Sequence, residues 1–331
     1  MLIDIYTHIF PARFFEYLLN GSNKLGSLAE RLKSVKAVVD LDARFRAMDG
    51  FGDYRQIITL PHPALEEIAG DPEAAKLASL ANDGLAELCS KHPDRFPAFV
   101  ASVSLLNVES AVAEAERAVT QLGARGIQIH TNVLGRPLDD PSFDPIFKAM
   151  AKHDLPIWMH PARTASVADY STESNSRFEM WWCFGWPYET SVAMARLVFS
   201  GVFDRYPKLK IITHHLGGMI PTFDGRIGPG MQFLGSRTTA EDHSKVLSSL
   251  KRPHLEYFKM FYGDTAMFGG TSGLHSGMAF FGADHVVFAT DAPFAPIGET
   301  IKALDVLQLS QNDRRKVCVG NAEKLLGMTF S

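Results

Sequence analysis

The sequence predicts a (β/α)8 barrel, the TIM-barrel fold, from three observations. Short apolar segments alternate with amphipathic helical segments along the chain. The number of apolar segments that fit strands is the number that this barrel needs. No GxGxxG turn follows the first strand, which argues against an open doubly wound sheet. The length of 331 residues fits one large barrel or two ordinary domains, and we expect a single domain over residues 1–331.

The predicted strands are short and well separated. Their ranges are 2–7, 55–60, 97–103, 126–130, 155–160, 210–215, 258–264 and 285–290. Between them, the clearest helices cover 72–92 and 108–123, where apolar residues recur at three- and four-residue spacing. The longest irregular segment, 162–188, is polar and then strongly aromatic. Long loops in compact domains usually have a function, so we expect this insertion to act as a lid.

The first strand carries polar side chains inside an apolar run. Side chains two residues apart in a strand point to the same side. We therefore expect Asp4, Tyr6 and His8 on one face, and Ile3 and Ile5 on the other. A polar face on a strand needs a barrel interior, a functional site or water.

Polar side chains also end most of the later strands. TIM-barrel active sites lie at the carboxyl ends of the strands. The residues found there are His8, His130, His160, His214, His215, Asp264 and Asp291. One such histidine would be interpreted as a packed core residue, but several at one barrel mouth indicate a metal site. Imidazole and carboxylate ligands suit Zn, Mn or Fe.

Composition and charge exclude other classes of protein. The net charge is -4 with no basic block, so we expect no nucleic-acid partner. No apolar run is long enough to span a bilayer, and the N-terminus lacks the basic region of a signal peptide. Cys89, Cys183 and Cys318 form no CxxC pair, which indicates reduced thiols. We expect a cytoplasmic protein.

Four segments together resemble the amidohydrolase superfamily. They are IDIYTHIFP (3–11), IWMHP (157–161), YPKLKIITHHLGGMIP (206–221) and VVFATDAPF (286–294). The branch that they resemble is amidohydrolase family 2, which contains aminocarboxymuconate-semialdehyde decarboxylase-like and γ-resorcylate decarboxylase-like enzymes. The segment 196–218 is especially specific, and the resemblance extends to GNAEKLLG at 320–327.

The resemblance implies a mononuclear metal site. The family pattern has an HxH pair on strand one, a histidine on strand five and an aspartate on strand eight. The matching ligands here are His8, His160 and Asp291, and Tyr6 stands where the first histidine of the pair should be. A phenol, with a pKa near 10, is a poorer ligand and must either ionise or hydrogen-bond something else.

Three protein ligands still satisfy the usual count for catalytic zinc. We therefore expect one divalent ion per chain, with zinc as the first choice and manganese as the alternative. The other interpretation is a degenerate barrel that has lost its metal.

The resemblance also assigns His215 as the base or water activator on strand six. A regular strand would turn its neighbour His214 to the opposite side, so we interpret His214 as a packing residue. The helix that carries Arg44 and Arg46 resembles a mainly structural helix of the family, and we expect its charges to be solvated.

Four residues are candidates for binding substrate: Tyr6, His130, Trp186 and Arg226. His130 either contacts substrate or fills the barrel mouth. Trp186, in the aromatic part of the long loop, suits a wall against a planar ligand. Arg226 matches an arginine that in this family can reach the substrate carboxylate of a neighbouring subunit, and the alternative is a solvated helix residue. Glu189 is either a site residue or a charge near a helix N-terminus.

The implied function is metal-dependent nonoxidative decarboxylation of a small aromatic or muconate-like acid, with His215 and Asp291 as catalytic residues. One alternative is a hydrolase or hydratase that uses metal-activated water, with His215 as its general base. A second alternative is a noncatalytic binding barrel. The expected partners are a small carboxylate substrate and further copies of the chain, in a homodimer or homotetramer.

Overall fold

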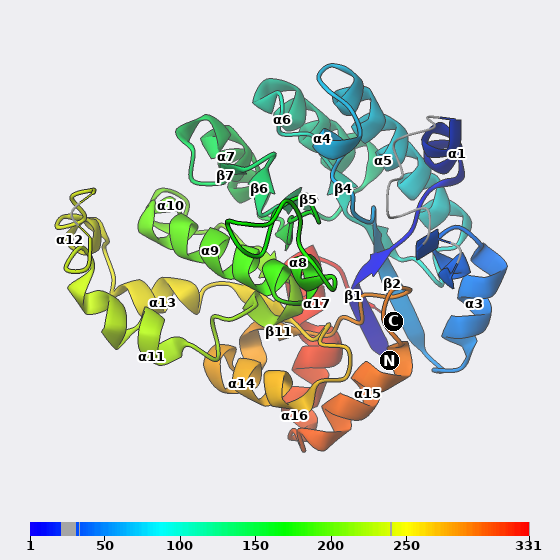
Figure 1. The fold of residues 1–331 in the computed structure, drawn as a ribbon. Helices are drawn as coiled ribbons and strands as arrows, with labels where there is room; N and C mark the ends of the chain where they lie inside the picture. Colours follow the sequence, from blue (N-terminus) through cyan, green and yellow to red (C-terminus); the bar gives the residue numbers. More distant parts are fainter. Residues whose placement is uncertain (21–30, 33, 239, 331) are drawn as a thin grey trace.

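Parallel strands alternate with helices along the chain in the computed structural model, which describes residues 1–20, 31–32, 34–238 and 240–330 (Figure 1). The strands are β1 Leu2–His8, β2 Tyr54–Thr59, β3 Ala98–Phe99, β4 Ala101–Ser102, β5 Ile127–His130, β6 Asn132–Val133, β7 Arg136–Pro137, β8 Ile157–His160, β9 Ile211–Thr213, β10 Tyr262–Asp264 and β11 Val286–Val287. The helices of the first half are α1 Ala12–Asn20, α3 Leu41–Asp49, α4 Leu65–Ile68, α5 Glu73–Lys91, α6 Val108–Arg117 and α7 Asp144–His153. Those of the second half are α8 Met180–Cys183, α9 Gly185–Phe199, α10 Val202–Arg205, α11 Asp224–Ile227, α12 Val246–Ser249, α13 His254–Phe258, α14 Thr271–Phe281, α15 Ile297–Val306, α16 Gln311–Arg315 and α17 Asn321–Leu326.

The strands follow one another around a TIM barrel, as predicted. The barrel strands form two parallel sheets, with the orders β1-β2-β3 and β11-β10-β9-β8-β5-β4, and β6 and β7 form a separate antiparallel pair. β3 and β4 are two parts of one predicted strand, and Val100 N between them still donates to Ile58 O at 3.0 Å. At the other edge, Ile5 N donates to Phe288 O at 2.9 Å, which links β1 to the chain that follows β11.

Several predicted elements differ at their ends, and the strand expected over 285–290 is only Val286–Val287. The strand expected over 210–215 ends at Thr213, and the strand expected over 258–264 begins only at Tyr262, after α13. The helix expected over 108–123 is α-helical to Arg117 and continues as one π-helical turn. Local apolar pattern locates an element well, but its ends depend on tertiary hydrogen bonds that the pattern does not contain.

The first strand is also less regular than expected. Its pairing with β2 shifts register between Asp4 and Thr7. As a result, Tyr6 joins Ile3 and Ile5 in one buried apolar cluster, and the expectation that Asp4 shares a face with Tyr6 is wrong. The Asp4 carboxylate instead accepts hydrogen bonds from the Tyr54 hydroxyl and from Thr290 N, the latter at 3.0 Å.

That apolar cluster forms a packed floor beneath the polar ends of the strands. It combines residues of β1, β8, β9 and β11 with α17. Trp158 on β8 is fully buried and donates from Nε1 to Ile5 O on β1 at 3.0 Å. The floor fixes the two strands that end in His8 and His160 relative to each other.

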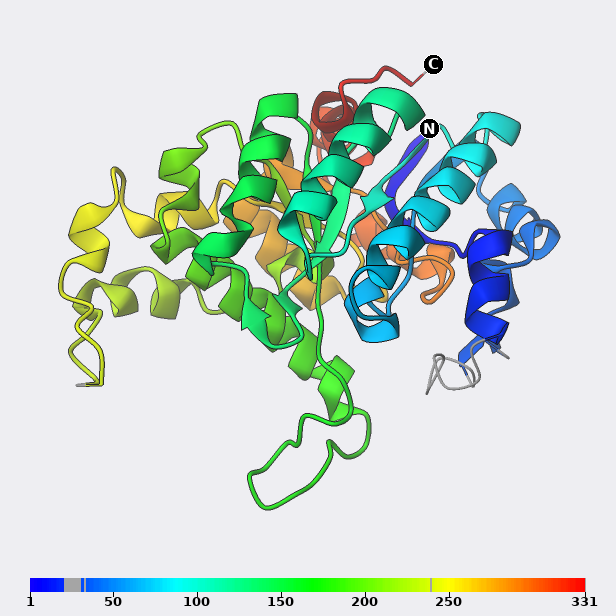
Figure 2. The ribbon, with the colours of Figure 1, turned by 90° about the horizontal axis from the view of Figure 1, so that it is seen from above.

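The predicted insertion is only partly irregular. The chain leaves β8 and forms a long loop that projects from the body of the molecule (Figure 2). It returns as the short helix α8, and α9 begins at Gly185, inside the range 162–188. Within the residues that the structure describes, no helix is both long and apolar enough to cross a membrane.

Candidate metal centre

Histidines from three different segments converge at the carboxyl ends of the strands. Ring nitrogens of His8, His160 and His214 lie within 4.8 Å of one another, and the same holds for ligand atoms of His214, His215 and Asp291. The Nε2 atom of His8 lies 3.1 Å from Asp291 Oδ1, and that of His214 lies 3.7 Å from the same oxygen. The structure thus brings the predicted ligands His8, His160 and Asp291 together.

Thr59 fixes the tautomer of His8. The Thr59 hydroxyl donates to Thr7 O at 3.0 Å, so its oxygen is left to accept the Nδ1 proton of His8 at 2.8 Å. The Nε2 atom of His8 then carries the lone pair and faces Asp291. A histidine held through Nδ1 by an outer partner is the common arrangement in metal sites.

The other two histidines are held in the same way. His160 donates from Nδ1 to Pro161 O at 2.7 Å, and His214 donates from Nδ1 to Asp264 Oδ2 at 2.6 Å. In the neutral form of each of these three rings, Nε2 is therefore the free ligand atom.

Burial sets the charges of the cluster. It lowers the pKa values of His8 and His160, which keeps both rings neutral, as ligation requires. Burial also acts to lower the pKa of His214, but the neighbouring Asp264 and Asp291 carboxylates outweigh it and raise that pKa to about 9. Against its own burial, the neighbouring His214 and His8 side chains hold the pKa of Asp291 below the ordinary value.

The buried polar atoms of the cluster fit a divalent cation. His8 Nε2, His214 Nε2 and the Tyr6 hydroxyl are buried and have no hydrogen-bond partner. Buried polar atoms without partners are rare in proteins, and each needs an explanation. A metal ion bound between these imidazole nitrogens and the Asp291 carboxylate would explain why the nitrogens have no hydrogen-bond partner.

Tyr6 lies beside this set. Its side chain is fully buried, and its ring centroid lies 4.3 Å from that of His214 and 5.2 Å from that of His8. Burial raises the pKa of the phenol well above 10, and the Asp264 and Asp291 charges raise it further. A neutral hydroxyl is a hydrogen-bond donor rather than a strong ligand, and Tyr6 stays a candidate for binding substrate beside the metal site.

The interpretation of His214 as a packing residue facing away is wrong. The strand ends before it, and His215 has a left-handed backbone with φ of 54°. The two consecutive rings consequently stack, with centroids 3.7 Å apart, and both contribute to the cluster. His215 donates from Nδ1 to Ala266 O at 2.5 Å, which leaves its Nε2 free.

Asp264 orients the histidines of the cluster from outside it, a role that the sequence did not predict. It is fully buried, and besides holding His214 it accepts from His215 N at 3.0 Å and Ala266 N at 3.1 Å. One carboxylate thereby fixes both the ring of His214 and the turn that carries His215. The sequence feature that points to this residue is its position at the end of a predicted strand, which is β10 in the structure.

We expect Asp264→Asn to lower kcat/KM about 10- to 100-fold, the range found when an outer partner of a metal-bound histidine is removed. The amide cannot supply the same charge to His214, although it preserves the shape. Steady-state kinetics and metal content of the purified variant test this. Unchanged values of both would show that Asp264 only shapes the turn.

Aromatic rings form one wall of the site. The Trp186 ring centroid lies 5.3 Å from that of His160, and the His130 ring centroid lies 5.4 Å from it. His62, in the loop after β2, lies 6.0 Å from His160 in a stacked arrangement. His130 and Trp186 thus lie where substrate-binding residues are expected, and His62 was missed because the second strand ends before it.

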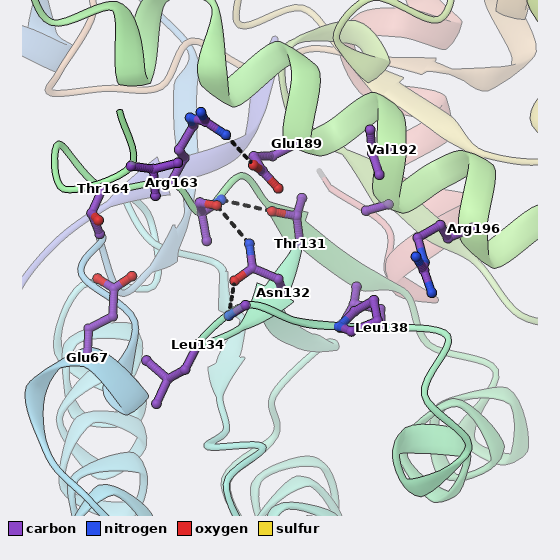
Figure 3. A pocket seen from close by; sticks show the side chains of 15 residues that line it. Glu67, Thr131, Asn132, Leu134, Leu138, Arg163, Thr164, Glu189, Val192 and Arg196 are labelled. Atoms are coloured by element: carbon purple, nitrogen blue, oxygen red, sulfur yellow. Dashed lines mark hydrogen bonds and ion pairs between the residues drawn. The ribbon is translucent and has the colours of Figure 1, made fainter. Parts of the chain in front are cut away.

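A cavity of about 630 Å³ lies next to this wall (Figure 3). Its lining includes Thr131 and Ala162, which closely follow His130 and His160 in the chain. Among its lining residues, the Arg163 guanidinium donates from Nη1 to Glu189 Oε1 at 3.0 Å. Glu189 is therefore the partner of an arginine beside the site, and the cavity adjoins the metal cluster without being lined by it.

The arginines predicted from the family behave differently from each other. Arg44 is buried, not solvated as expected, and donates from Nη1 to His8 O at 2.5 Å and from Nη2 to Thr7 Oγ1 at 3.0 Å. It therefore stabilises the end of β1 that carries a metal ligand. Arg226 is exposed on α11, with its guanidinium 5.9 Å from the Phe223 ring centroid. In both views, α11 belongs to an extension at one side of the barrel (Figures 1 and 2).

A histidine and aspartate cluster of this kind at the mouth of a TIM barrel defines a metal-dependent barrel enzyme. A family model described as amidohydrolase matches residues 3–328, and the chain belongs to the amidohydrolase family.

Relatives with known activities match over most of the chain. A γ-resorcylate decarboxylase of Polaromonas sp. strain JS666 is 33% identical over 297 residues, covering 86% of each chain. A 2-amino-3-carboxymuconate-6-semialdehyde decarboxylase of Dictyostelium discoideum is 31% identical, covering 77% of this chain and 68% of that protein. The chain is an enzyme of this metal-dependent, nonoxidative carboxy-lyase type.

A solved structure matches the whole chain. It is a dihydroxybenzoic acid decarboxylase of Polaromonas sp. JS666 with bound manganese and the inhibitor 2-nitroresorcinol. Its TM-score is 0.81 at 28% identity, covering 100% of this chain and 98% of that one. A divalent metal is therefore the cofactor that both the family and the ligand atoms support.

Proposed function

We propose that the substrate is a small aromatic acid with a hydroxyl group next to its carboxylate, or a muconate-like acid with an oxygen in the same position. The observation that carries this proposal is the cluster of His8, His160, His214 and Asp291 beside an aromatic wall, in a relative of decarboxylases of such acids. Two adjacent oxygens suit chelation to one metal ion, and the Trp186 ring suits a planar ligand.

His8, His160 and Asp291 would hold the metal, with their Nε2 and carboxylate atoms. As a Lewis acid, the bound ion would stabilise negative charge on the substrate oxygens. Zinc remains our sequence-based expectation. The manganese bound in the similar Polaromonas structure supports manganese as the alternative, and elemental analysis of protein purified without chelators distinguishes them.

In this mechanism the proton is delivered by His215, after its Nε2 has taken one from water, or by Asp291 in its protonated form. The proton bonds to the ring carbon that carries the carboxylate. The carbon–carbon bond to the carboxylate then breaks, its electron pair returns to the ring, and carbon dioxide leaves. His215 suits this role because Nδ1 is fixed on Ala266 O and Nε2 is free to exchange a proton.

A panel of acids tests the proposal. Purified protein loaded with Zn²⁺ or Mn²⁺ is incubated with 2-hydroxybenzoate, 2,6-dihydroxybenzoate and muconate-like acids, and carbon dioxide release is measured together with the organic product. The expected product lacks the carboxylate and has gained no oxygen. A product that has gained the elements of water would instead support the hydrolase or hydratase alternative.

Assembly and environment remain proposals. We propose a homodimer or homotetramer in the cytoplasm, in which residues of the segment 162–188 cover the bound substrate. The exposed side chains of Phe184 and Tyr188, one helical turn apart at the start of α9, support a contact between copies, since large exposed apolar side chains that lie together often mark interfaces.

If Arg226 reaches the substrate carboxylate of a neighbouring subunit, Arg226→Ala should raise KM at least tenfold while the oligomer stays intact. The loss of a charge-assisted, bidentate contact to a carboxylate gives this magnitude. Kinetics combined with light scattering test it, with Arg237→Ala as a control on the same exposed region. A monomeric wild-type protein at assay concentration would exclude the role.

A further inference from the structure

The proposed metal ligand Asp291 has an unusual backbone conformation. Its φ is 66°, in the left-handed region that residues other than glycine rarely adopt. Such a conformation costs about 1–3 kcal/mol and persists only where the surrounding structure enforces it. With this backbone, Asp291 Oδ1 lies 3.1 Å from His8 Nε2, so the conformation sets the direction of the carboxylate. Other groups must therefore hold the segment 290–292 in place.

Thr290 forms hydrogen bonds on both sides of Asp291. Its hydroxyl donates to Asp4 Oδ2 at 2.5 Å and accepts from Ala292 N at 3.1 Å. Its backbone N donates to Asp4 Oδ1 at 3.0 Å. Thr290 and Asp4 are both fully buried. One carboxylate thus takes two hydrogen bonds from Thr290, and the Thr290 hydroxyl connects that carboxylate to the peptide that follows Asp291.

Asp4 is itself held by a buried network. The Tyr54 hydroxyl donates to its carboxylate, and Gln56 Nε2 donates to the Tyr54 hydroxyl oxygen at 2.9 Å. Arg44 Nε donates in turn to Gln56 Oε1 at 2.7 Å. All four side chains are buried. Because each of them has a buried partner in the network, the Asp4 carboxylate has a fixed position from which it holds Thr290.

Closing the barrel does not require the hydrogen bonds between Asp4 and Thr290. Backbone groups already join β1 to the chain after β11, for example through His8 N, which donates to Ala292 O at 2.8 Å. A carboxylate is costly to bury, and hydrogen bonds must offset that cost. The feature that the backbone alone does not explain is the left-handed residue Asp291, which lies between the two peptides that Thr290 bonds.

We propose that Thr290, held by Asp4, is a positioning residue that keeps the Asp291 carboxylate directed at the metal. The inference rests on the role of Asp291 in the proposed function, but not on the identity of the substrate. Thr290 acts through the backbone of its neighbour, because its hydroxyl is occupied by Asp4 and by Ala292 N and is not free to ligate.

The test measures the binding of Zn²⁺ and of Mn²⁺ to metal-free protein by calorimetry or by competition with a chelator. Thr290→Val removes the hydroxyl but keeps the volume and the branched shape. It should raise the Kd for metal about 10- to 100-fold, the range found when an outer partner of a metal ligand is lost. Thr290→Ser keeps the hydroxyl and should bind metal nearly as tightly as the wild type.

Asn321→Ala is the matched control for a loss of stability. Asn321 is buried on α17, and its Nδ2 donates to Ala283 O and to Val286 O, both at 2.7 Å, at the amino end of β11. Both Asn321→Ala and Thr290→Val remove buried hydrogen bonds, so both should lower the Tm of the metal-free protein. Only Thr290→Val should change the Kd for metal.

A second variant tests the same network if Thr290→Val does not fold. Asp4→Asn keeps the shape of the side chain but offers one acceptor oxygen instead of two. It should shift the Kd for metal in the same direction as Thr290→Val. A folded Asp4→Asn with the Kd of the wild type would contradict the proposal.

Two further results would overturn the positioning role. One is an unchanged Kd in folded Thr290→Val, and the other is a loss of affinity that Thr290→Ser shares. Asp291→Ala separates this failure from a failure of the proposed ligand set. If Asp291→Ala still binds metal like the wild type, the ligand set is wrong and the inference falls with it. If Asp291→Ala loses metal but Thr290→Val binds it normally, the positioning role alone is wrong.

Discussion

Replacing His160 with alanine should remove the bound metal and lower kcat/KM about a thousandfold. His160 offers one lone pair, because its Nδ1 proton is held by Pro161 O, and that lone pair faces His8 and His214. The alanine variant leaves two predicted ligands, His8 and Asp291, which is below the count of a catalytic site. Loss of several kcal/mol of Lewis-acid stabilisation corresponds to this factor in rate.

Elemental analysis and kinetics of the same preparation measure both effects. Wild type should contain about one divalent ion per chain, and His160→Ala should contain far less. His153→Ala is a suitable control, because His153 on α7 also bonds a carboxylate, Glu116, through Nε2 at 2.7 Å but lies on a helix outside the mouth. Full activity of a metal-free wild type would contradict the assignment of all three ligands.

The ligands that the sequence predicted share one property. His8, His160 and Asp291 each follow an apolar run that folds as a strand or its direct extension, so their common position at the barrel mouth could be read from pattern and resemblance. The barrel itself was predictable for the same reason, since alternating strands and helices have few compact arrangements.

The residues that were misplaced depend on contacts between distant segments. His214 faces the site because Asp264 holds its ring and fixes the left-handed turn at His215. Asp4 leaves the face of Tyr6 because the register with β2 shifts. No local pattern encodes a partner fifty residues away or a shift that two strands share.

His62 and Arg44 illustrate a second limit. His62 lies in a loop, three residues beyond β2, and it joins the site only because His130 and His160 pack around it. Arg44 lies on a helix whose other charges are solvent-facing, yet its guanidinium caps the carbonyl of His8. A helix pattern tells which face is apolar, but not that a charged side chain is buried to hold a strand end.

Tyr6→Phe should slow the enzyme about 10- to 1000-fold without loss of metal. The neutral phenol lies against His214, and its hydroxyl is buried with no partner in the protein. A water or a substrate oxygen beside the metal is the partner that this position offers, and one stabilising donor contributes a factor of this order to catalysis.

The same substitution should leave the metal-free protein as stable as the wild type or more stable, by about 1 kcal/mol. Removing a buried hydroxyl that has no partner removes its desolvation penalty, while the ring still packs in the floor of the barrel. Thermal unfolding after chelation measures this, and kinetics after reloading measure the rate. Slower turnover together with equal or higher stability is the signature of a hydroxyl kept for the reaction rather than for the fold.

Tyr6→His separates the two remaining interpretations of this position. A histidine restores the family's paired ligands on β1 and should tighten metal binding, because imidazole ligates without ionising a phenol. Competition with a chelator compares the affinities of wild type, Tyr6→Phe and Tyr6→His. If Tyr6→Phe loses its metal as readily as His160→Ala, the phenol is itself a ligand, and the hydroxyl without a partner is explained by the ion rather than by substrate.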